Sequence, residues 1–366
     1  MSYRSTILAV VILVISLTLF GCGSKTSENK SEINNEKVTI AIATTDINIG
    51  YPYATLPLEM GWYEEEGIDV NVVPGDGSQG VIQLLVSGKA DLGVINTESG
   101  VMATANEQVD VKSVYAASRK NGYSFTVMED SEINDVADLE GKNIGYLDLG
   151  SGGVPYAHAR FKEAGVPVDS VEEMSVGYGA QAFEALKSGT VDAYVVFAAG
   201  HARGLVSGYD IKKLPLADWQ DNMYNFNLYA TDKYIKEDGD IIEKVGRAFA
   251  KATVFTKTNP EAVVDIFWDQ YPEQAPKNRD SKALESDMII LDAQLDDLRA
   301  EELPVDFMWG SQEADAWEFQ QQFMLDEGMI EEKVDVNLLF DNQFQDEFMD
   351  FNIEEIVKQA EEWEIN

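Results

Sequence analysis

Short apolar runs alternate with longer amphipathic stretches over residues 38–117. Residues 38–43, 68–73, 91–96 and 111–117 are rich in Val, Ile and Ala and have the length of strands, so each predicts a buried β-strand. Between them, residues 54–66 and the stretch that ends at Val86 carry apolar side chains at helical spacing. Strands that alternate with helices through short connections predict a mostly parallel sheet with helices on both faces.

One segment of this pattern occurs twice in the chain. Residues 85–94 read LVSGKADLGV and residues 186–195 read LKSGTVDAYV, with five of ten positions identical. In each copy a helix is predicted to end at a Ser-Gly pair, where glycine tolerates the left-handed conformation, before an Asp and a short apolar strand. Because the order of the flanking elements also repeats, the sequence predicts two α/β lobes of related architecture.

The second copy assigns the middle of the chain to a lobe of its own. We expect lobe one to comprise residues 38–118 and 227–366, and lobe two to comprise residues 119–226. The two crossings, near residues 117–120 and 224–226, would then act as a hinge. From residue 241 onward the apolar positions follow the spacing of helices with a buried stripe, so a helical C-terminal region is predicted.

The first 37 residues are predicted to lie outside the folded body. Arg4 precedes an apolar run of 14 residues, which suits a signal peptide and is short for a membrane-spanning helix. The run ends in Leu19-Phe-Gly-Cys22, which resembles a bacterial lipoprotein cleavage site. This resemblance implies a signal peptide over residues 1–21, lipid attachment at Cys22, and a location on the outer face of the cell membrane or in the periplasm. The alternative is an ordinary signal peptide with a chance cysteine. Residues 22–37 are polar and predict a flexible tether.

The chain is strongly acidic, with 65 Asp and Glu residues against 27 Lys and Arg residues and a net charge of −38. Such a chain repels phosphate backbones, so nucleic acid is excluded as a partner. Cys22 is the one cysteine, so neither a disulfide nor a thiolate metal site can form within a single chain. The acidic residues gather after residue 301, and we interpret them as a solvated face.

Motifs of enzyme chemistry are absent or out of context. Gly75-Asp-Gly-Ser-Gln-Gly80 matches the glycine pattern of dinucleotide loops, but it follows the second strand, is preceded by Pro74, and lacks the acidic strand-end residue expected about 20 positions later. His158 and His201, the two histidines, are predicted to lie on the surface. No G-x-S-x-G elbow or nucleophile–base pair is evident, so no catalytic residue, metal or cofactor is predicted.

Four motifs together resemble a known family. Met60-Gly-Trp-Tyr-Glu-Glu-Glu-Gly-Ile-Asp-Val70, Ser87-Gly-Lys-Ala-Asp-Leu-Gly93, Asp138-Leu-Glu-Gly-Lys-Asn-Ile-Gly145 and Ser188-Gly-Thr-Val-Asp-Ala193 are similar, in this order, to the extracytoplasmic solute-binding proteins of ABC importers. The most similar group serves nitrate, taurine and other sulfonates, and pyrimidine precursors of thiamine. The resemblance implies a two-lobed periplasmic-binding-protein-like α/β fold, a ligand in the cleft, and a monomer that partners an ABC permease and its ATPase. The alternatives are a ligand-sensing lipoprotein and a secreted enzyme on the same scaffold.

Ligands of open α/β sheets bind beyond the carboxyl ends of the strands, where loops and helix N-termini converge. The residues that we expect there in lobe one are Thr45, Asp46, Tyr53, Gly77, Ser78, Gln79, Asn96 and Thr97, and those in lobe two are Ser151, Gly152, Tyr178 and Phe197. Arg119, near the hinge, is the best-placed cation.

The chemistry of these residues leaves two classes of ligand open. A nitrate or sulfonate would require Arg119 or several N–H donors. A flat heterocycle would stack on Tyr53, Tyr178 or Phe197 and bind to Asp46 or Asn96. The combination of rings with acids favours an uncharged or cationic heterocycle.

Overall fold

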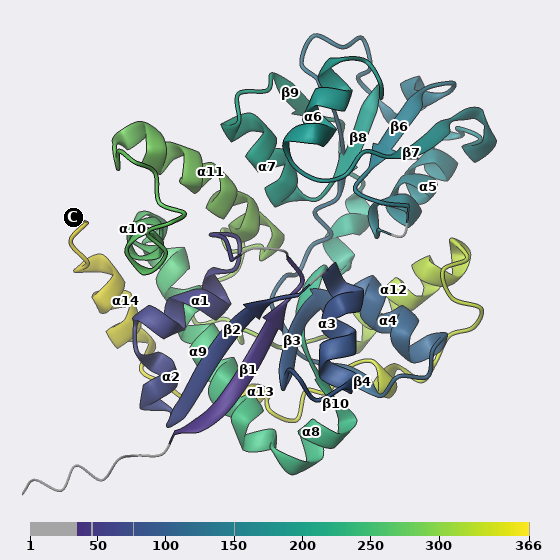
Figure 1. Ribbon diagram of the computed structural model, residues 1–366. Helices are drawn as coiled ribbons and strands as arrows, with labels where there is room; N and C mark the ends of the chain where they lie inside the picture. Colours follow the sequence, from purple (N-terminus) through teal and green to yellow (C-terminus); the bar gives the residue numbers. More distant parts are fainter. Residues whose placement is uncertain (1–34, 45–46, 76, 150, 366) are drawn as a thin grey trace, which may run out of the picture. The chain divides into compact units, whose positions relative to one another are not determined.

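Two five-stranded sheets, one in each lobe, form the frame of the computed structural model, which describes residues 35–44, 47–75, 77–149 and 151–365 (Figure 1). The sheet of lobe one has the order β2-β1-β3-β10-β4, and the sheet of lobe two has the order β7-β6-β8-β5-β9. The strands of lobe one are β1 (Glu36–Ile42), β2 (Ile68–Pro74), β3 (Leu92–Asn96), β4 (Val111–Ala116) and β10 (Phe226–Thr231), so Phe226, which we expected at the end of lobe two, belongs to the sheet of lobe one. Those of lobe two are β5 (Ser124–Met128), β6 (Asn143–Tyr146), β7 (Glu172–Ser175), β8 (Ala193–Val196) and β9 (Ile211–Lys213). The predicted two-lobed α/β fold is confirmed.

Each sheet contains one strand that runs against its neighbours. β10 is antiparallel to β3 and β4, and β5 is antiparallel to β8 and β9, whereas β1 and β6 pair in parallel with both of their neighbours. Both exceptions follow a crossing between the lobes. Because the chain leaves lobe one at the carboxyl edge of its sheet, it enters the other lobe at the edge that faces the first, and the next strand must run away from it.

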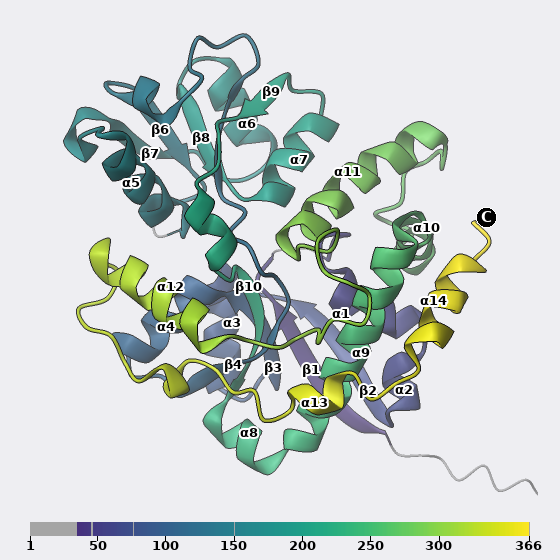
Figure 2. The ribbon, with the colours of Figure 1, turned by 180° about the vertical axis from the view of Figure 1, so that it is seen from behind.

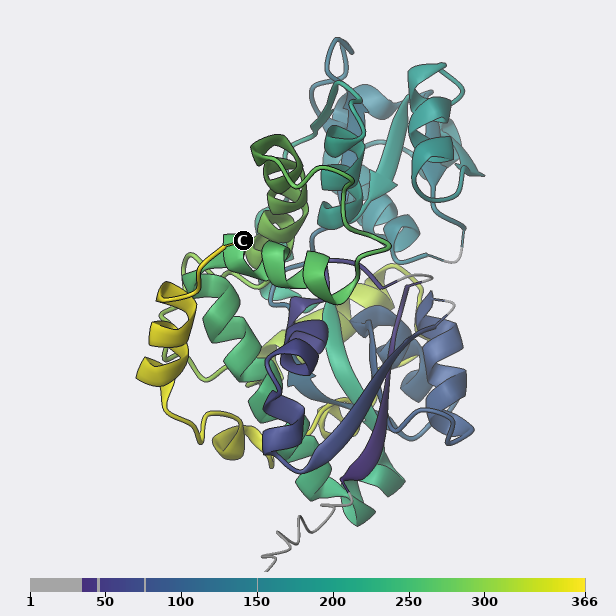
Figure 3. The same ribbon diagram turned by 60° about the vertical axis from the view of Figure 1, so that its left-hand side comes forward.

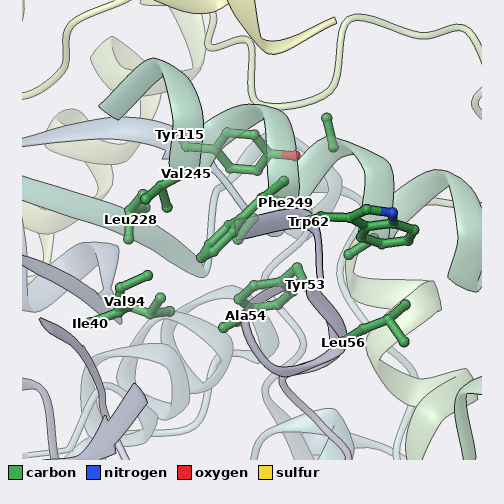
Figure 4. Packing of buried hydrophobic residues seen from close by; sticks show 14 of the residues in the cluster. Ile40, Tyr53, Ala54, Leu56, Trp62, Val94, Tyr115, Leu228, Val245 and Phe249 are labelled. Carbon is green, nitrogen blue, oxygen red and sulfur yellow. The ribbon is translucent and has the colours of Figure 1, made fainter. Parts of the chain in front are cut away.

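The core of lobe one lies between its sheet and three helices, α1 (Pro52–Glu59), α2 (Trp62–Glu65) and α9 (Gly239–Thr258). Figure 4 shows Phe249 of α9 between Tyr115 and Tyr53, with ring centroids 5.5 and 5.3 Å away. The single helix predicted over residues 54–66 is wrong, because Gly61 adopts a φ of 71° and separates α1 from α2. The opposite face of the sheet is covered by α3 (Gly77–Val86) and α4 (Thr97–Ala105).

Lobe two has the same three-layer plan with fewer residues. Its helices are α5 (Gly153–Ala164), α6 (Ala180–Lys187) and α7 (Ala198–Val206). Phe125 and Phe161 pack in the core beneath α5, and Phe183 and Tyr194 pack in the core beneath α6. Each face of the central strand β8 is therefore buried by its own cluster.

The repeated segment has the same conformation in both lobes. Gly88 and Gly189 follow the ends of α3 and α6 with φ of 67° and 73°, in the left-handed region where a side chain would be strained. The Asp91 carboxylate accepts a hydrogen bond from the backbone N–H of Thr39 in β1 at 2.7 Å. The Asp192 carboxylate accepts one from Asn143 in β6 at 2.9 Å. In each lobe the Asp thus anchors the turn to a neighbouring strand, at the middle of β1 and at the start of β6.

The C-terminal region is helical, as predicted, and most of it surrounds lobe one. Its helices are α8 (Asp232–Glu237), α10 (Pro260–Gln270), α11 (Ser281–Asp297), α12 (Ala314–Asp326), α13 (Gln345–Phe348) and α14 (Ile353–Glu361). α14 lies on the outer side of α9 (Figure 3), and α11 packs against α7 of lobe two (Figures 1 and 2). Within the described residues, none of the helices combines the length and the apolar character that crossing a membrane requires.

Candidate functional site

A pocket of about 300 Å³ lies between the two sheets and takes its walls from both lobes. It opens where β1, β6 and β8 end, which is the carboxyl edge of each sheet. Lobe one contributes Ala43, Thr44, Asn48, Gly50, Tyr51, Gly77, Phe226, Ile290, Gln294 and Asp297, and lobe two contributes Leu147, Asp148, Tyr178, Phe197, Ala199 and Arg203.

Aromatic rings from both lobes line this pocket. Tyr178 and Phe197 of lobe two are stacked, with centroids 5.6 Å apart and planes 16° from parallel. Phe226 of lobe one meets Phe197 edge-on at 6.4 Å, and Tyr51 meets Phe226 at 6.5 Å. The guanidinium of Arg203 lies 5.7 Å from the centre of the Tyr178 ring. Such rings offer a flat ligand stacking contacts on the lobe-two side of the pocket.

A buried carboxyl group, that of Asp297, closes the pocket from the end of α11. Its residue is 5% exposed, and among the described residues no group lies within hydrogen-bonding geometry of its Oδ1. The Asp297 carbonyl accepts a hydrogen bond from the Arg119 backbone N–H at 2.7 Å. The carboxyl packs against Gly122, where a Cβ would stand 2.2 Å from Oδ1. Glycine at position 122 is therefore what allows this carboxyl to approach the first crossing.

The groups around Asp297 have opposing effects on the pKa of its carboxyl. The pKa of this carboxyl is raised to about 7, first by burial and then by the neighbouring Asp296, while the charges of Lys213 and Lys120 and the nearby Asn225 amide act in the opposite direction. The Lys120 ammonium itself donates to Asp296 at 3.2 Å. Near neutral pH, Asp297 can thus exist as a carboxylate or as a carboxylic acid, depending on what a ligand presents to it.

Three of the residues expected at the site line the pocket, namely Gly77, Tyr178 and Phe197. Ser151 lies beside it, where its hydroxyl donates to the carbonyl of the pocket residue Asp148 at 2.8 Å. Gly152 precedes α5 near the Tyr123 ring, and Gln79 is exposed on α3. Thr45 and Asp46 lie outside the described residues.

Other expected residues have positions in the framework of lobe one. Tyr53 is 3% exposed, and its ring packs on Phe249 in the core. The Ser78 hydroxyl accepts from the backbone N–H of Asn96 at 3.0 Å, and the Asn96 side chain caps α4. Arg119 faces a different hollow, where it donates to Ser311 and lies 4.5 Å from the centre of the Phe307 ring. None of these side chains lines the pocket, although the Tyr53 ring meets the pocket ring Tyr51 edge-on at 6.1 Å from the core side.

The first turn of α4 also holds both crossings between the lobes. Thr97 donates from its backbone N–H to the Asn225 carbonyl at 2.7 Å and from its hydroxyl to the Tyr224 carbonyl at 2.9 Å. The Asn121 amide donates to the Glu98 carboxylate at 3.1 Å. Burial raises the pKa of Glu98 to about 7, and its hydrogen bonds offset part of this effect. Both crossings are thus anchored on lobe one.

Sequence reasoning missed Tyr51, Phe226, Arg203 and Asp297 as pocket residues. Tyr51 was within reach of a local signal, since Pro52 begins α1 and so leaves Tyr51 before the helix and Tyr53 inside it. Asp297 carried no such signal, because it is one of many acids in the C-terminal region.

One of the two histidine predictions is wrong. His201 is 6% exposed, and its Nδ1 lies 2.8 Å from the Thr126 hydroxyl, because α7 turns this side chain towards β5. Burial lowers the pKa of His201 to about 3, so it is neutral at physiological pH. His158 is partly exposed and lies 2.9 Å from the Glu173 carboxylate. In the described part of the chain, no group of three or more His, Cys, Asp or Glu side chains could hold a metal ion.

Comparisons with known proteins agree with this geometry. The family model described as "NMT1/THI5 like" matches residues 55–263, more than half of the chain. A formylaminopyrimidine-binding protein from Halalkalibacterium halodurans is 23% identical over 260 residues, which cover 70% of this chain and 77% of that protein. The periplasmic aliphatic sulphonate-binding protein SsuA from Escherichia coli superposes with a TM-score of 0.63 at 20% identity, over 84% of this chain and 92% of its own. The desulfurization enzyme DSZB superposes with a TM-score of 0.58 at 14% identity, over 86% and 99%.

Proposed function

Because this chain belongs to the NMT1/THI5-like family, we propose that it is the substrate-binding protein of an ABC importer, which captures a small flat molecule between its lobes and delivers it to the permease. The observation that carries the proposal is the pocket of about 300 Å³ at the carboxyl edges of both sheets. A ligand that touches both walls stabilises the closed arrangement of the lobes. The permease and its ATPase can then distinguish loaded from empty protein by shape.

The lining of the pocket favours a nitrogen heterocycle over a sulfonate. Rings from both lobes lie on its walls, and its described charged residues are two carboxylates, Asp148 and Asp297, against one guanidinium, Arg203. A sulfonate carries a full negative charge and would meet a net negative wall. A relative of this chain is a formylaminopyrimidine-binding protein, so we propose a ligand of that kind.

Binding experiments with purified protein test this function. At a hundredfold excess over Kd, formylaminopyrimidine should stabilise the fold by about 2.7 kcal/mol, which is visible as a rise in melting temperature. Solution scattering should show a smaller radius of gyration. An alkanesulfonate at the same concentration should produce neither effect. If the alkanesulfonate produced both effects and formylaminopyrimidine neither, the ligand would be an anion and not a heterocycle. A native mass spectrum would show which molecule co-purifies.

The Tyr178→Ala variant tests whether the pocket itself binds the ligand. Tyr178 lies on the pocket wall and is stacked on Phe197, so its loss should weaken binding and leave the melting of the ligand-free protein nearly unchanged. A large loss of ligand-free stability with intact affinity would show that Tyr178 is a packing residue and that the ligand binds elsewhere.

We extend the proposal to the N-terminal segment, which lies outside the described residues. With a lipid on Cys22 the protein would be held at the outer face of the membrane by its anchor alone and would act there as a monomer. The Cys22→Ser variant should therefore move from the membrane fraction into the medium or the periplasm. If it stayed in the membrane fraction after a high-salt wash, the anchor would be wrong.

An enzyme on the same scaffold is the alternative, since the structurally similar DSZB is an enzyme. We propose a binding protein, because the matching sequence relative is one. Incubation with formylaminopyrimidine should return the compound unchanged by chromatography. A product that increased with time would favour the enzyme.

A further inference from the structure

The lining of the pocket includes a buried carboxyl group, that of Asp297, whose hydrogen-bonding capacity the described residues do not fill. Oδ1 of Asp297 belongs to a residue that is 95% buried and that lines the pocket, and among the described residues it receives no hydrogen bond. Buried carboxylate oxygens nearly always accept hydrogen bonds. An oxygen that is buried without a donor loses its hydrogen bonds to water and gains none from the protein, which costs free energy. The Asp297 carboxyl therefore has unused acceptor capacity at the pocket wall, which a ligand donor can fill.

The charged groups around Asp297 do not supply that donor. Lys120 donates to Asp296, on the exposed side of the helix, at 3.2 Å. Lys213 favours the charged form of Asp297 through its field, and among the described residues neither lysine lies within bonding geometry of Oδ1. The Asn225 amide lies close enough to Asp297 to favour its charged form through a weak hydrogen bond, but the contact falls outside ordinary hydrogen-bonding geometry. The two lysines thus offset the two acids, while Oδ1, which lies against Gly122, receives no hydrogen bond from the described residues.

From this geometry we infer that Asp297 is the specificity-determining residue of the pocket and selects ligands whose ring carries an N–H donor, such as an exocyclic amino group. The inference rests on the proposed function and deepens it. The stacked rings Tyr178 and Phe197 accept any flat ligand, since stacking discriminates poorly between heterocycles. A hydrogen bond to a buried carboxylate discriminates strongly, because a ligand without the donor leaves the acceptor unpaired.

Asp297 also lies where a ligand bound to it would connect the two lobes. It ends α11, which lies beyond the residues 55–263 that match the family model. α11 is part of lobe one, yet it packs against α7, the helix of lobe two that carries Ala199 and Arg203. A ligand held by the rings of lobe two and by Asp297 therefore bridges the lobes, so selection and closure depend on the same contact.

A pair of ligands that differ in one group tests the inference. The probes are 4-amino-2-methylpyrimidine and 2,4-dimethylpyrimidine, in which a methyl group of similar size replaces the amino group. Dissociation constants are measured by calorimetry for the wild type, Asp297→Asn and Asp297→Leu. The matched control is Asp296→Asn, which changes the adjacent acid, whose side chain is 58% exposed and does not line the pocket.

We expect the wild type and Asp296→Asn to prefer the amino compound at least tenfold. Asp297→Asn keeps an acceptor without the charge and should reduce the preference, and Asp297→Leu should abolish it. Affinity for the dimethyl compound should change less than threefold throughout. Both Asp297 variants remove a buried charge, so their ligand-free melting temperatures at neutral pH should equal or exceed that of the wild type.

The possible failures separate the inference from the proposed function. If Asp297→Leu retained the preference, or if the wild type had none, Asp297 would not determine specificity, while binding of either pyrimidine would still support the proposed function. If an alkanesulfonate bound and neither pyrimidine did, the inference would be overturned and the importer role would stand with an anion. If no probe bound to the wild type, both the ligand class and the inference would be wrong.

Discussion

Asn96 and Phe197 occupy equivalent positions in the two lobes, two residues beyond the ends of the repeated segment, but their side chains have different surroundings. Asn96 ends β3, caps α4 by accepting a hydrogen bond from the Ser99 N–H, and donates to Asn225 at 3.2 Å. Phe197 follows β8, makes no side-chain cap for α7, and contributes its ring to the pocket. One copy of the position thus supports the hinge, and the other meets the ligand.

The two copies agree where they build the sheet and differ where the sheet faces the pocket. Asp91 and Asp192 anchor their turns to β1 and β6 in the same way. At the opposite edge both lobes present rings, but the stacked pair Tyr178 and Phe197 and the guanidinium of Arg203 belong to lobe two, whereas lobe one adds Asp297 from a helix that lobe two lacks among its described residues. The repeated segment thus keeps the residues that hold the turn and the strand together. The stacked pair, Arg203 and Asp297 line the pocket from positions outside the strands, which do not hold the sheet together.

The largest effect should come from the shared anchor. Asp91→Ala and Asp192→Ala each remove a charged acceptor from a backbone N–H, so each should lower the free energy of unfolding by about 2 kcal/mol. Urea denaturation measures this loss, and the corresponding Asn variants, which retain an acceptor, should lose less. A loss confined to one lobe would break the equivalence of the two copies.

The next effect separates the two lobes. Phe197→Ala should weaken binding of formylaminopyrimidine about tenfold by removing a stacking ring, with little change in stability. Asn96→Ala should lower the free energy of unfolding by about 1 kcal/mol through loss of the helix cap, with little direct effect on the pocket lining. Calorimetric titration and urea denaturation of both variants would reveal the contrast, and equal behaviour in both assays would contradict it.

Asp297 in lobe one and His201 in lobe two should contribute to the pH dependence of stability with opposite signs. The pKa of Asp297 in lobe one is raised to about 7, so its contribution to stability falls as pH rises from about 4 to 7. The pKa of His201 in lobe two is lowered to about 3, so its contribution falls as pH drops from about 6.5 towards 3. Each group changes the slope by at most about 1.4 kcal/mol per pH unit.

Two variants separate these contributions in urea denaturation between about pH 4 and 6.5. His201→Gln should steepen the loss of stability with rising pH, and Asp297→Asn should reduce that loss, leaving the contribution of Glu98, whose pKa is also raised to about 7. Slopes that stayed unchanged in both variants would show that neither group titrates differently in the folded protein.

The smallest effect concerns the link between lobe two and the C-terminal region. Lys162 of α5 pairs with Glu327 at 3.3 Å, but its side chain is 65% exposed, so Lys162→Ala should change the free energy of unfolding by less than about 0.5 kcal/mol. Trp219→Ala removes a ring that lies 4.9 Å from Phe323 of α12 and should cost more. If the two variants had equal effects in urea denaturation, the contact would not be mainly apolar.

The sequence by itself determined the fold and the family, because their signals are local. Apolar runs of strand length, glycines that end helices, and the repeated Ser-Gly-x-x-Asp turn depend on neighbouring residues, and all of them predict two α/β lobes. The same local reasoning located Gly77, Tyr178 and Phe197, which follow strands at the carboxyl edge. Two corrections to the sequence-based prediction also have local causes. Gly61 divides the predicted helix into α1 and α2, and Pro52 begins α1, so that Tyr51 precedes the helix and Tyr53 lies inside it.

Only the tertiary structure decided which polar groups face the ligand. The environment of Asp297 is made by Gly122 and Arg119 of the first crossing and by Lys213 of β9, all far away in the chain. Burial without a donor is a property of this assembled surrounding, and nothing in the acidic sequence around residue 297 distinguishes this carboxyl from its neighbours. Tertiary packing likewise buried His201, because the direction of its side chain depends on how α7 lies on β5.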